Sequence, residues 1–245
     1  MTWLHDALLD AYGPQSWWPA GFALEVILGA ILVQNTAWTS ARRALDNLQA
    51  AGIFSLEAIR EAPEAVLADL VRPAGYYNAK ARKLQAFAAR VDELADGDLD
   101  ALLARPLAEL RPLLLATHGF GPETTDVVLL YAARRPVFVI DAYTRRLVER
   151  LGWAAPRLSY ETARAAFEAA LPPEVERFAQ YHALIVLHGK ETCRKQPRCD
   201  ACPLLGDCAF GQARAGLAPV GRDGPLGGRR NARPSPRRTV TDWNA

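Results

Sequence analysis

The four cysteines of the chain lie close together, in the pattern Cys-x5-Cys-x2-Cys-x5-Cys. A hydrophobic core gives no reason to gather its thiols in this way, and in a reducing compartment they would not pair. Shared metal ligation is therefore the favoured interpretation, with two disulfides as the alternative. Four thiolates suit either a Zn(Cys)4 site, which composition alone favours, or a [4Fe-4S] cluster. The candidate ligands are Cys193, Cys199, Cys202 and Cys208.

Three basic side chains, Arg194, Lys195 and Arg198, lie between the first two cysteines. A loop held rigid by a metal would present them on a fixed surface, and such a surface suits contacts with the phosphates of DNA. Of the 29 Lys and Arg residues, the lysines are Lys80, Lys83, Lys190 and Lys195. Because arginine stays protonated, these are the side-chain amines that could act as nucleophiles.

A second motif places Gly119 and Gly121 one residue apart between two stretches of helical periodicity. The glycines permit a tight turn with bare backbone, and Pro122 followed by Glu123 is typical of a helix start. Backbone N–H groups at such a start can hold an anion, which predicts a phosphate-binding hairpin. A plain connection between helices is the alternative, and Gly-x-Gly alone does not separate the two.

A third candidate is the carboxylate of Asp141, which follows four apolar residues and precedes another helical stretch. Asp141 could simply cap that helix. The functional alternative is a carboxylate at the mouth of a pocket, where it could orient a water molecule and stabilise positive charge that develops on a sugar. The residue types and spacing leave both interpretations open.

The elements that must position these residues are helical. Apolar residues recur three or four apart along nearly the whole chain, which predicts an all-α fold. The apolar run at 137–140 is expected to be a buried extended connector. Helices are expected over 22–34, 41–51, 63–71, 79–94, 107–116, 123–132, 142–151, 160–170 and 173–187.

Composition excludes several classes of protein. Half of the 245 residues are hydrophobic, which excludes overall disorder, and the longest apolar run, 26–33, is shorter than the ~20 residues of a membrane span. The N-terminus lacks the features of a secretory signal, so we expect a soluble cytoplasmic monomer. Residues 213–245 are rich in Gly, Pro and Arg and carry a net charge of +5, against −3 for the rest. This tail is expected to be disordered, either as a solvated terminus or as an aid to DNA binding.

Taken together, the Gly119–Gly121 hairpin, Asp141 and the cysteine loop resemble the endonuclease III superfamily of DNA glycosylases in order and rough separation. The resemblance spans about residues 20 to 210. The segment 31–36 resembles the family's segment with a DNA-inserting glutamine, here Gln34, and 74–81 resembles a family helix entry. The first cysteine gap is five residues, where most relatives have six.

The resemblance implies a helix-hairpin-helix glycosylase fold in two modules. Residues 22–132 would form a six-helix barrel, and 1–21 with 133–212 would form a second helical module. The family's metal is a [4Fe-4S] cluster, so the resemblance favours the cluster over zinc. Enzymes of this class flip the target nucleotide out of the duplex, because the bond to be broken is inaccessible in the stack.

The resemblance also assigns roles. Gln34 would fill the vacated space, the amides near Gly119 and Gly121 would hold a phosphate, and Asp141 would be the catalytic carboxylate. The implied partner is double-stranded DNA with a damaged base, which places the protein at the nucleoid. Arg194 and Lys195 would add contacts to DNA.

Glu123 decides the expected subtype. Bifunctional members of the family carry a lysine at this position, and a carboxylate cannot form the imine that β-elimination requires. Asp141 and Glu123 are thus the candidate catalytic residues of a monofunctional enzyme, most like the 3-methyladenine glycosylase branch. Thymine or uracil mismatch excision, a bifunctional enzyme and a catalytically silent DNA-binding relative are the alternatives. The aromatic candidates for pocket walls are Trp17, Trp18, Trp38, Tyr76 and Tyr77.

Overall fold

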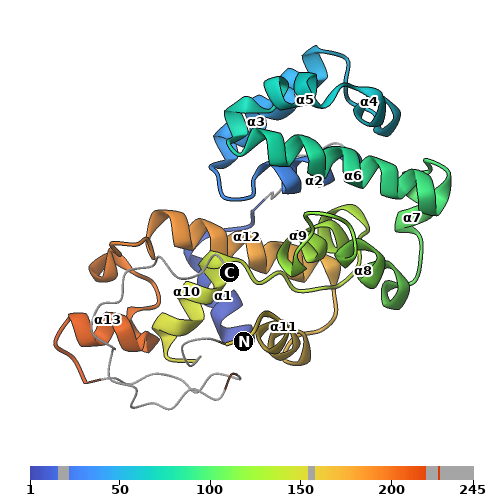
Figure 1. The fold of residues 1–245 in the computed structure, drawn as a ribbon. Helices are drawn as coiled ribbons and strands as arrows, with labels where there is room; N and C mark the ends of the chain where they lie inside the picture. Colours follow the sequence, from blue (N-terminus) through green and yellow to red (C-terminus); the bar gives the residue numbers. More distant parts are fainter. Residues whose placement is uncertain (16–21, 154–157, 219–225, 227–245) are drawn as a thin grey trace. The chain divides into compact units, whose positions relative to one another are not determined.

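Figure 1 shows the fold of the chain in a computed structural model that describes residues 1–15, 22–153, 158–218 and 226. Within these residues the chain forms helices and connecting segments and no strand, which confirms the predicted all-α class. No helix among them combines the length and the apolar character needed to cross a membrane. Trp17, Trp18 and most of the tail 213–245 lie outside the described residues.

The helices follow one another with short connections. In chain order they are α1 (Thr2–Tyr12), α2 (Ala23–Leu32), α3 (Trp38–Ala50), α4 (Leu56–Glu61), α5 (Glu64–Leu70), α6 (Tyr77–Ala95), α7 (Leu99–Leu103), α8 (Leu107–Leu115), α9 (Pro122–Val127), α10 (Ala142–Leu151), α11 (Tyr160–Ala169), α12 (Val175–Glu191) and α13 (Ala209–Arg214). A π-helical turn, Val128–Ala132, continues α9. Short 3-10 turns occupy Arg72–Ala74, Cys199–Ala201 and Leu205–Asp207.

Every helix expected from periodicity occurs, with ends that differ by a few residues. The short helices α4 and α7 were not expected, because six and five residues are too few for an apolar repeat to show. Both begin at a side-chain cap: the Ser55 hydroxyl accepts a hydrogen bond from Ala58 N at 3.1 Å, and the Asp98 carboxylate accepts one from Ala101 N at 2.9 Å. Such caps were the available sequence signal.

The chain packs as two compact units. The hairpin unit comprises Ser16–Val139 and Pro173–Gln180, and the cysteine unit comprises Met1–Gln15, Ile140–Pro172 and Tyr181–Ala245. Helix α12 therefore contributes its beginning to the hairpin unit and the rest to the cysteine unit. The functional division expected from the sequence, 22–132 against 1–21 with 133–212, stays a prediction.

The core of the hairpin unit forms around α2 and α6, which lie against each other, with α4 and α5 against α6 (Figure 1). Burying an aliphatic or aromatic side chain contributes about 1.5–3 kcal/mol, so this core fixes the two helices. Because α6 is anchored in this core, its polar side chains have defined positions. The fully buried members of this core include Ile27, Leu28, Ile31, Leu45, Leu84, Phe87 and Leu110.

The connector 137–140 is buried, as predicted, and is neither helix nor strand. Phe138 packs edge-to-face on Phe178 of α12, with ring centroids 5.4 Å apart. The connector leads directly to Asp141 and α10.

In the cysteine unit, α1 and α12 are joined by polar contacts, and α10 lies beside α13. The Tyr12 hydroxyl lies 2.8 Å from both His188 Nδ1 and Thr192 Oγ1. The Arg150 guanidinium of α10 lies over the Phe210 ring of α13, 4.8 Å from its centroid. These contacts hold the end of α12, from which the cysteine loop begins.

Candidate functional site

The two hairpin glycines have different structural reasons to be glycine. Gly119 has φ of 87°, a left-handed conformation that favours glycine, and a Cβ there would lie 2.3 Å from Lys83 Cγ. Gly121 has an ordinary φ of −94°, and a Cβ there would meet no atom within 4 Å. Gly119 is thus required by the fold, whereas Gly121 leaves an open face of backbone just before α9.

The side chain of Gln34 is tied to this hairpin by its amide group. Gln34 Nε2 donates to the carbonyl oxygen of Gly119 at 3.1 Å and to Thr124 Oγ1 at 2.8 Å, and Gln34 Oε1 accepts from Lys83 Nζ at 2.5 Å. Both amide hydrogens and the oxygen are therefore used within the hairpin unit. The structure brings Gln34, Gly119 and Lys83 together, and the sequence indicated only the first two.

Lys83 is the lysine that folding brings to the hairpin. Its methylene chain covers the Gly119 backbone, and burial lowers the pKa of its amine. One turn earlier on α6, Lys80 is 2% exposed and donates to the carbonyl oxygens of Leu32 at 2.9 Å and Ala74 at 2.7 Å. Burial lowers the pKa of Lys80 to about 8, and the nearby charge of Lys83 adds to the effect. These contacts could not be predicted from local patterns, because Lys83 and Gly119 lie far apart along the chain.

Glu123 lies in the first turn of α9 and is exposed. A carboxylate in this position interacts favourably with the positive end of the helix. It belongs to the hairpin unit, whereas Asp141 belongs to the cysteine unit.

Asp141 does cap α10, as the simpler interpretation held. Its Oδ1 accepts hydrogen bonds from the Thr144 backbone N at 2.7 Å and from Thr144 Oγ1 at 2.8 Å. Its other oxygen, Oδ2, lies 3.6 Å from His182 Nε2 on α12. The Asp141 side chain keeps 11% of its surface exposed, so the carboxylate is largely but not completely enclosed. Capping therefore uses Oδ1 and leaves Oδ2 to other contacts.

The surroundings of Asp141 favour its ionised form. Burial by itself would raise its pKa, but His182, together with the two hydrogen bonds from Thr144, outweighs burial and lowers the pKa below its ordinary value. Asp141 is thus a carboxylate at neutral pH in a place where few charges are tolerated. The sequence did not indicate His182, because it lies forty-one residues further along the chain.

The four cysteines are free thiols that line one small pocket. Among the described residues, no three His, Cys, Asp or Glu side chains are grouped closely enough to hold a single metal ion. A structural zinc requires its sulfurs at ~2.3 Å from one point, whereas a polynuclear cluster needs a wider set of ligands. The pocket is lined by Cys193, Cys199, Cys202 and Cys208, with Leu147, Arg150, His188, Leu205 and Phe210 among their neighbours.

Groups on α10, α12 and α13 orient the cysteine sulfurs. Arg150 donates to Cys193 Sγ at 3.2 Å, His188 Nε2 lies 4.0 Å from Cys202 Sγ, and Gly211 N donates to Cys208 Sγ at 3.4 Å. Burial raises the pKa of the Cys202 thiol to about 11 and lowers that of His188 to about 4. Binding of a metal cluster would thus have to release protons from buried thiols.

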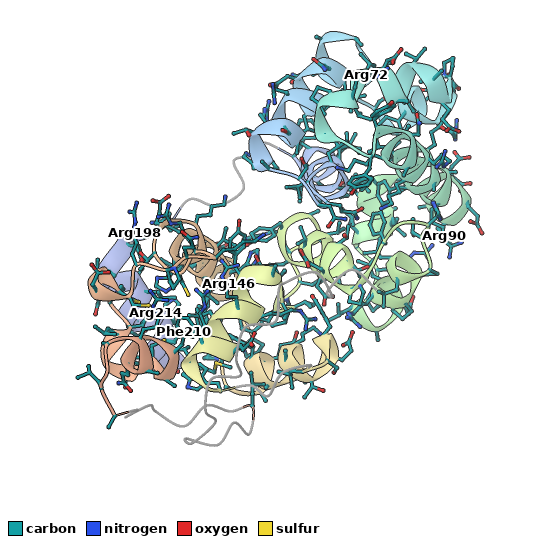
Figure 2. The ribbon with its side chains drawn as sticks, turned by 60° about the vertical axis from the view of Figure 1, so that its left-hand side comes forward. Arg72, Arg90, Arg146, Arg198, Phe210 and Arg214 are labelled. Carbon is teal, nitrogen blue, oxygen red and sulfur yellow. The ribbon has the colours of Figure 1, made fainter. Side chains whose placement is uncertain are left out.

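The basic residues of the cysteine loop are exposed, as predicted, and their backbone is fixed. Arg150 donates to the carbonyl oxygen of Arg194 at 2.7 Å and to that of Lys195 at 3.1 Å. Arg146 of α10 donates to the Cys193 carbonyl oxygen at 2.8 Å. Figure 2 shows Arg146, Arg198, Phe210 and Arg214 around this part of the cysteine unit.

Of the aromatic residues proposed as pocket walls, the structure describes Trp38, Tyr76 and Tyr77. Trp38 and Tyr77 pack against the core of the hairpin unit, and Arg72 lies over the Tyr77 ring, 4.6 Å from its centroid. Tyr76 is 73% exposed and has a left-handed backbone, with φ of 46°. A residue other than glycine in this left-handed conformation carries backbone strain.

Comparisons with known proteins agree on one family. Residues 28–173 match the model of the HhH-GPD superfamily of base excision DNA repair proteins. The chain is 42% identical over 212 residues to a candidate DNA repair glycosylase of Methanocaldococcus jannaschii, covering 84% of this chain and 94% of the relative. It is 32% identical over 186 residues to endonuclease III of Sulfolobus acidocaldarius, covering 75% and 80% of the two chains.

Solved structures give the same result at the level of the fold. A 3-methyladenine DNA glycosylase of H. pylori, bound to 1,N6-ethenoadenine, is 28% identical, with a TM-score of 0.68 over 77% of this chain and 96% of that one. A non-covalent complex of endonuclease III with DNA has a TM-score of 0.76 and 21% identity, over 87% of this chain and 96% of that one.

Proposed function

The chain belongs to the HhH-GPD superfamily of base excision DNA repair proteins and is a DNA N-glycosylase, and we propose that it hydrolyses the N-glycosidic bond of an alkylated base without cleaving the DNA strand. The observation that carries this proposal is the enclosed, ionised carboxylate of Asp141, with one oxygen held by Thr144. Double-stranded DNA with one damaged base is the substrate, and the protein acts as a monomer.

DNA binding begins at the hairpin. The backbone amides near Gly119 and Gly121 hold a phosphate, because the first amides of a helix have no acceptor within the helix. The target nucleotide then leaves the base stack, and Gln34 fills the space that it leaves. To do so, Gln34 exchanges its three hydrogen bonds within the hairpin unit for contacts with bases. Arg194 and Lys195 neutralise further phosphates.

Asp141 acts when the bond between base and sugar breaks. As the base departs, positive charge develops on the deoxyribose, and a nearby carboxylate stabilises that charge more strongly where water is excluded. The same carboxylate orients the water molecule that adds to the sugar. The low pKa of Asp141 supports this role, since a protonated carboxyl group could do neither.

An alkylated base is the favoured substrate. Alkylated purines carry positive charge and leave readily, so an enzyme that acts on them needs little acid catalysis. The likeness to the H. pylori 3-methyladenine DNA glycosylase, at 28% identity, supports this choice. Excision of thymine or uracil from mismatches is the nearest alternative.

Hydrolysis without strand cleavage follows from Glu123, since a carboxylate cannot form an imine with the abasic sugar. One observation favours the second candidate function, a bifunctional glycosylase and lyase. Lys83 places an amine of lowered pKa beside the hairpin, and an uncharged amine is the group that imine formation requires.

The cysteine quartet is proposed to hold a [4Fe-4S] cluster through Cys193, Cys199, Cys202 and Cys208. A cluster bound there would fix the loop as a rigid, basic surface. Arg150 orients the loop through its contacts with Cys193, Arg194 and Lys195, and His188 faces Cys202.

One experiment tests the function and its subtype. The protein is incubated with duplexes that each carry one lesion: an alkylated purine, an ethenoadenine, or a thymine or uracil opposite guanine. Strand breaks are scored with and without alkali, and the reaction is repeated with borohydride to trap any imine. Breaks that require alkali, without a trapped adduct, support the proposal. A trapped adduct that Lys83→Met abolishes supports the bifunctional alternative. Duplex binding without base release on every lesion would indicate a catalytically silent relative.

A further inference from the structure

We infer that His182 is a positioning residue that keeps the Asp141 carboxyl group ionised and holds its Oδ2 in place. This inference rests on the proposed function, in which Asp141 acts as a carboxylate. It goes beyond that function because it assigns the state of Asp141 to a residue on another helix.

The geometry divides the two oxygens of Asp141 between two partners. Thr144, on the same helix, occupies Oδ1 with two hydrogen bonds. His182 approaches Oδ2 from α12, with Nε2 at 3.6 Å. This is an ion-pair distance rather than a hydrogen-bond length, and such contacts commonly tighten when substrate binds. The pair joins the start of α10 to the middle of α12.

His182 matters because both groups are buried. His182 is 5% exposed and Asp141 8% exposed, and an ionised carboxylate that has left water is costly unless it is paired. Among the described residues, the Asp141 charge acts on His182 of α12 and on Tyr143 of α10, whose pKa is raised by burial and by that charge and lowered in part by Arg146. From α11, Tyr160 contacts the preceding residue through its hydroxyl, which accepts from Ile140 N at 3.4 Å.

Of His182 and Tyr143, His182 is the one that can carry positive charge. When it is protonated, His182 places this charge at Nε2, 3.6 Å from Oδ2. Without His182, burial would dominate, and the carboxyl group would take up a proton at a higher pH. The rate of base release would then fall on the acid side of its pH profile, while the rate at higher pH would be retained.

The test compares His182→Phe and His182→Gln with the unaltered protein. The rate of base release is measured from pH 3 to 9 on the best lesion, and the carboxyl carbon of Asp141 is followed by NMR over the same range. We expect the acid limb and the Asp141 titration to move up by about 1 to 3 pH units in His182→Phe, the range found when an opposite charge beside a carboxylate is lost. His182→Gln, which can still donate a hydrogen bond, should shift both less.

The matched control is His5→Gln, which removes another buried histidine of the cysteine unit, one that pairs with Asp6 and packs on Tyr181. It should leave the acid limb unchanged. An acid limb that does not move in His182→Phe, or a loss of rate that is equal at every pH, would overturn the inference.

If His182→Phe does not fold, a measurement on the unaltered protein still tests the inference. A titration of its Asp141 carbon between pH 5 and 8 would show that His182 does not keep the group ionised, and so would overturn the inference. If no lesion is processed at all, the proposed function fails, but the NMR titrations test the His182 contact independently.

Discussion

Lys83 of α6 and Gln34, in the turn that follows α2, are joined by a hydrogen bond of 2.5 Å between Nζ and Oε1. The bond fixes which end of the Gln34 amide faces α6, so that its nitrogen is directed to Gly119 and Thr124. The proposed DNA-inserting residue is therefore held in one orientation before DNA arrives.

Replacing Lys83 should cost stability through this bond. Lys83→Met leaves Gln34 Oε1 without its donor in a half-buried place, and we expect the free energy of unfolding to fall by about 1 kcal/mol in urea titrations. The neighbouring Arg82→Met is the control. Arg82 pairs with Glu64 at 3.0 Å at an exposed position, and such pairs contribute little. Equal losses in both variants would contradict the assigned role of the bond.

The two hairpin glycines should respond differently to alanine. Gly119→Ala meets the Lys83 side chain and requires a left-handed alanine, so we expect the protein to lose at least about 1 kcal/mol of unfolding free energy. Gly121→Ala meets no atom, so its stability should stay within ~0.5 kcal/mol. Gly121→Ala should still weaken duplex binding, because a methyl group would stand on the proposed phosphate-binding face. Unchanged affinity would remove Gly121 from that face.

Asp141→Asn tests the proposed chemistry. Asparagine also caps helices, so the fold should be retained, while base release should fall about 100-fold or more because the negative charge is lost. Single-turnover rates on the best lesion measure the effect. Asp98→Asn makes the same change at the cap of α7, in the other compact unit, and should leave the rate unaltered.

Lys80 should make stability depend on pH. Its pKa is about 8 in the folded protein, below that of an ordinary lysine, so the folded state carries the cost of a buried ammonium group at lower pH. Between pH 8 and the pKa of the unfolded chain, the unfolded state binds more protons, and the free energy of unfolding should rise with pH. We expect a rise of about 1 kcal/mol between about pH 7.5 and pH 9.5, measured in urea, that is reduced in Lys80→Met. The exposed Lys190→Met should behave like the unaltered protein.

The cysteine loop makes a compositional prediction. Protein purified without oxygen should be brown and contain iron and acid-labile sulfide in equal amounts, and Cys202→Ser should lose both. Arg198→Ala, which removes an exposed side chain from the same loop, should keep the colour. Zinc at one ion per chain in a colourless preparation would contradict the proposed cluster.

The sequence predicted the fold better than the site. Buried helices such as α2 and α6 show a clear apolar repeat, and the apolar run at 137–140 indicated a buried connector. The gathering of the cysteines was visible because they lie close along the chain. The neighbours of the cysteines could not be predicted, because Arg150 and His188 come from helices whose packing is not specified by the apolar repeat.

The partners of the site residues were the part that could not be predicted. Gln34 and Asp141 were found by their motifs, but Lys83 and His182 reach them only through the packing of α6 and α12. A lysine or histidine on a predicted helix looks the same in the sequence whether it faces water or a buried amide. Contacts between distant segments depend on helix packing, which local patterns do not encode.

Because the Lys83 methylenes lie on the Gly119 backbone, positions 83 and 119 form a single steric unit. Asparagine, which tolerates left-handed backbone, could replace Gly119 only in a chain with a small residue at 83. A larger residue at position 119 therefore requires a smaller residue at position 83 of α6. We expect these two positions to change together in variants of this chain.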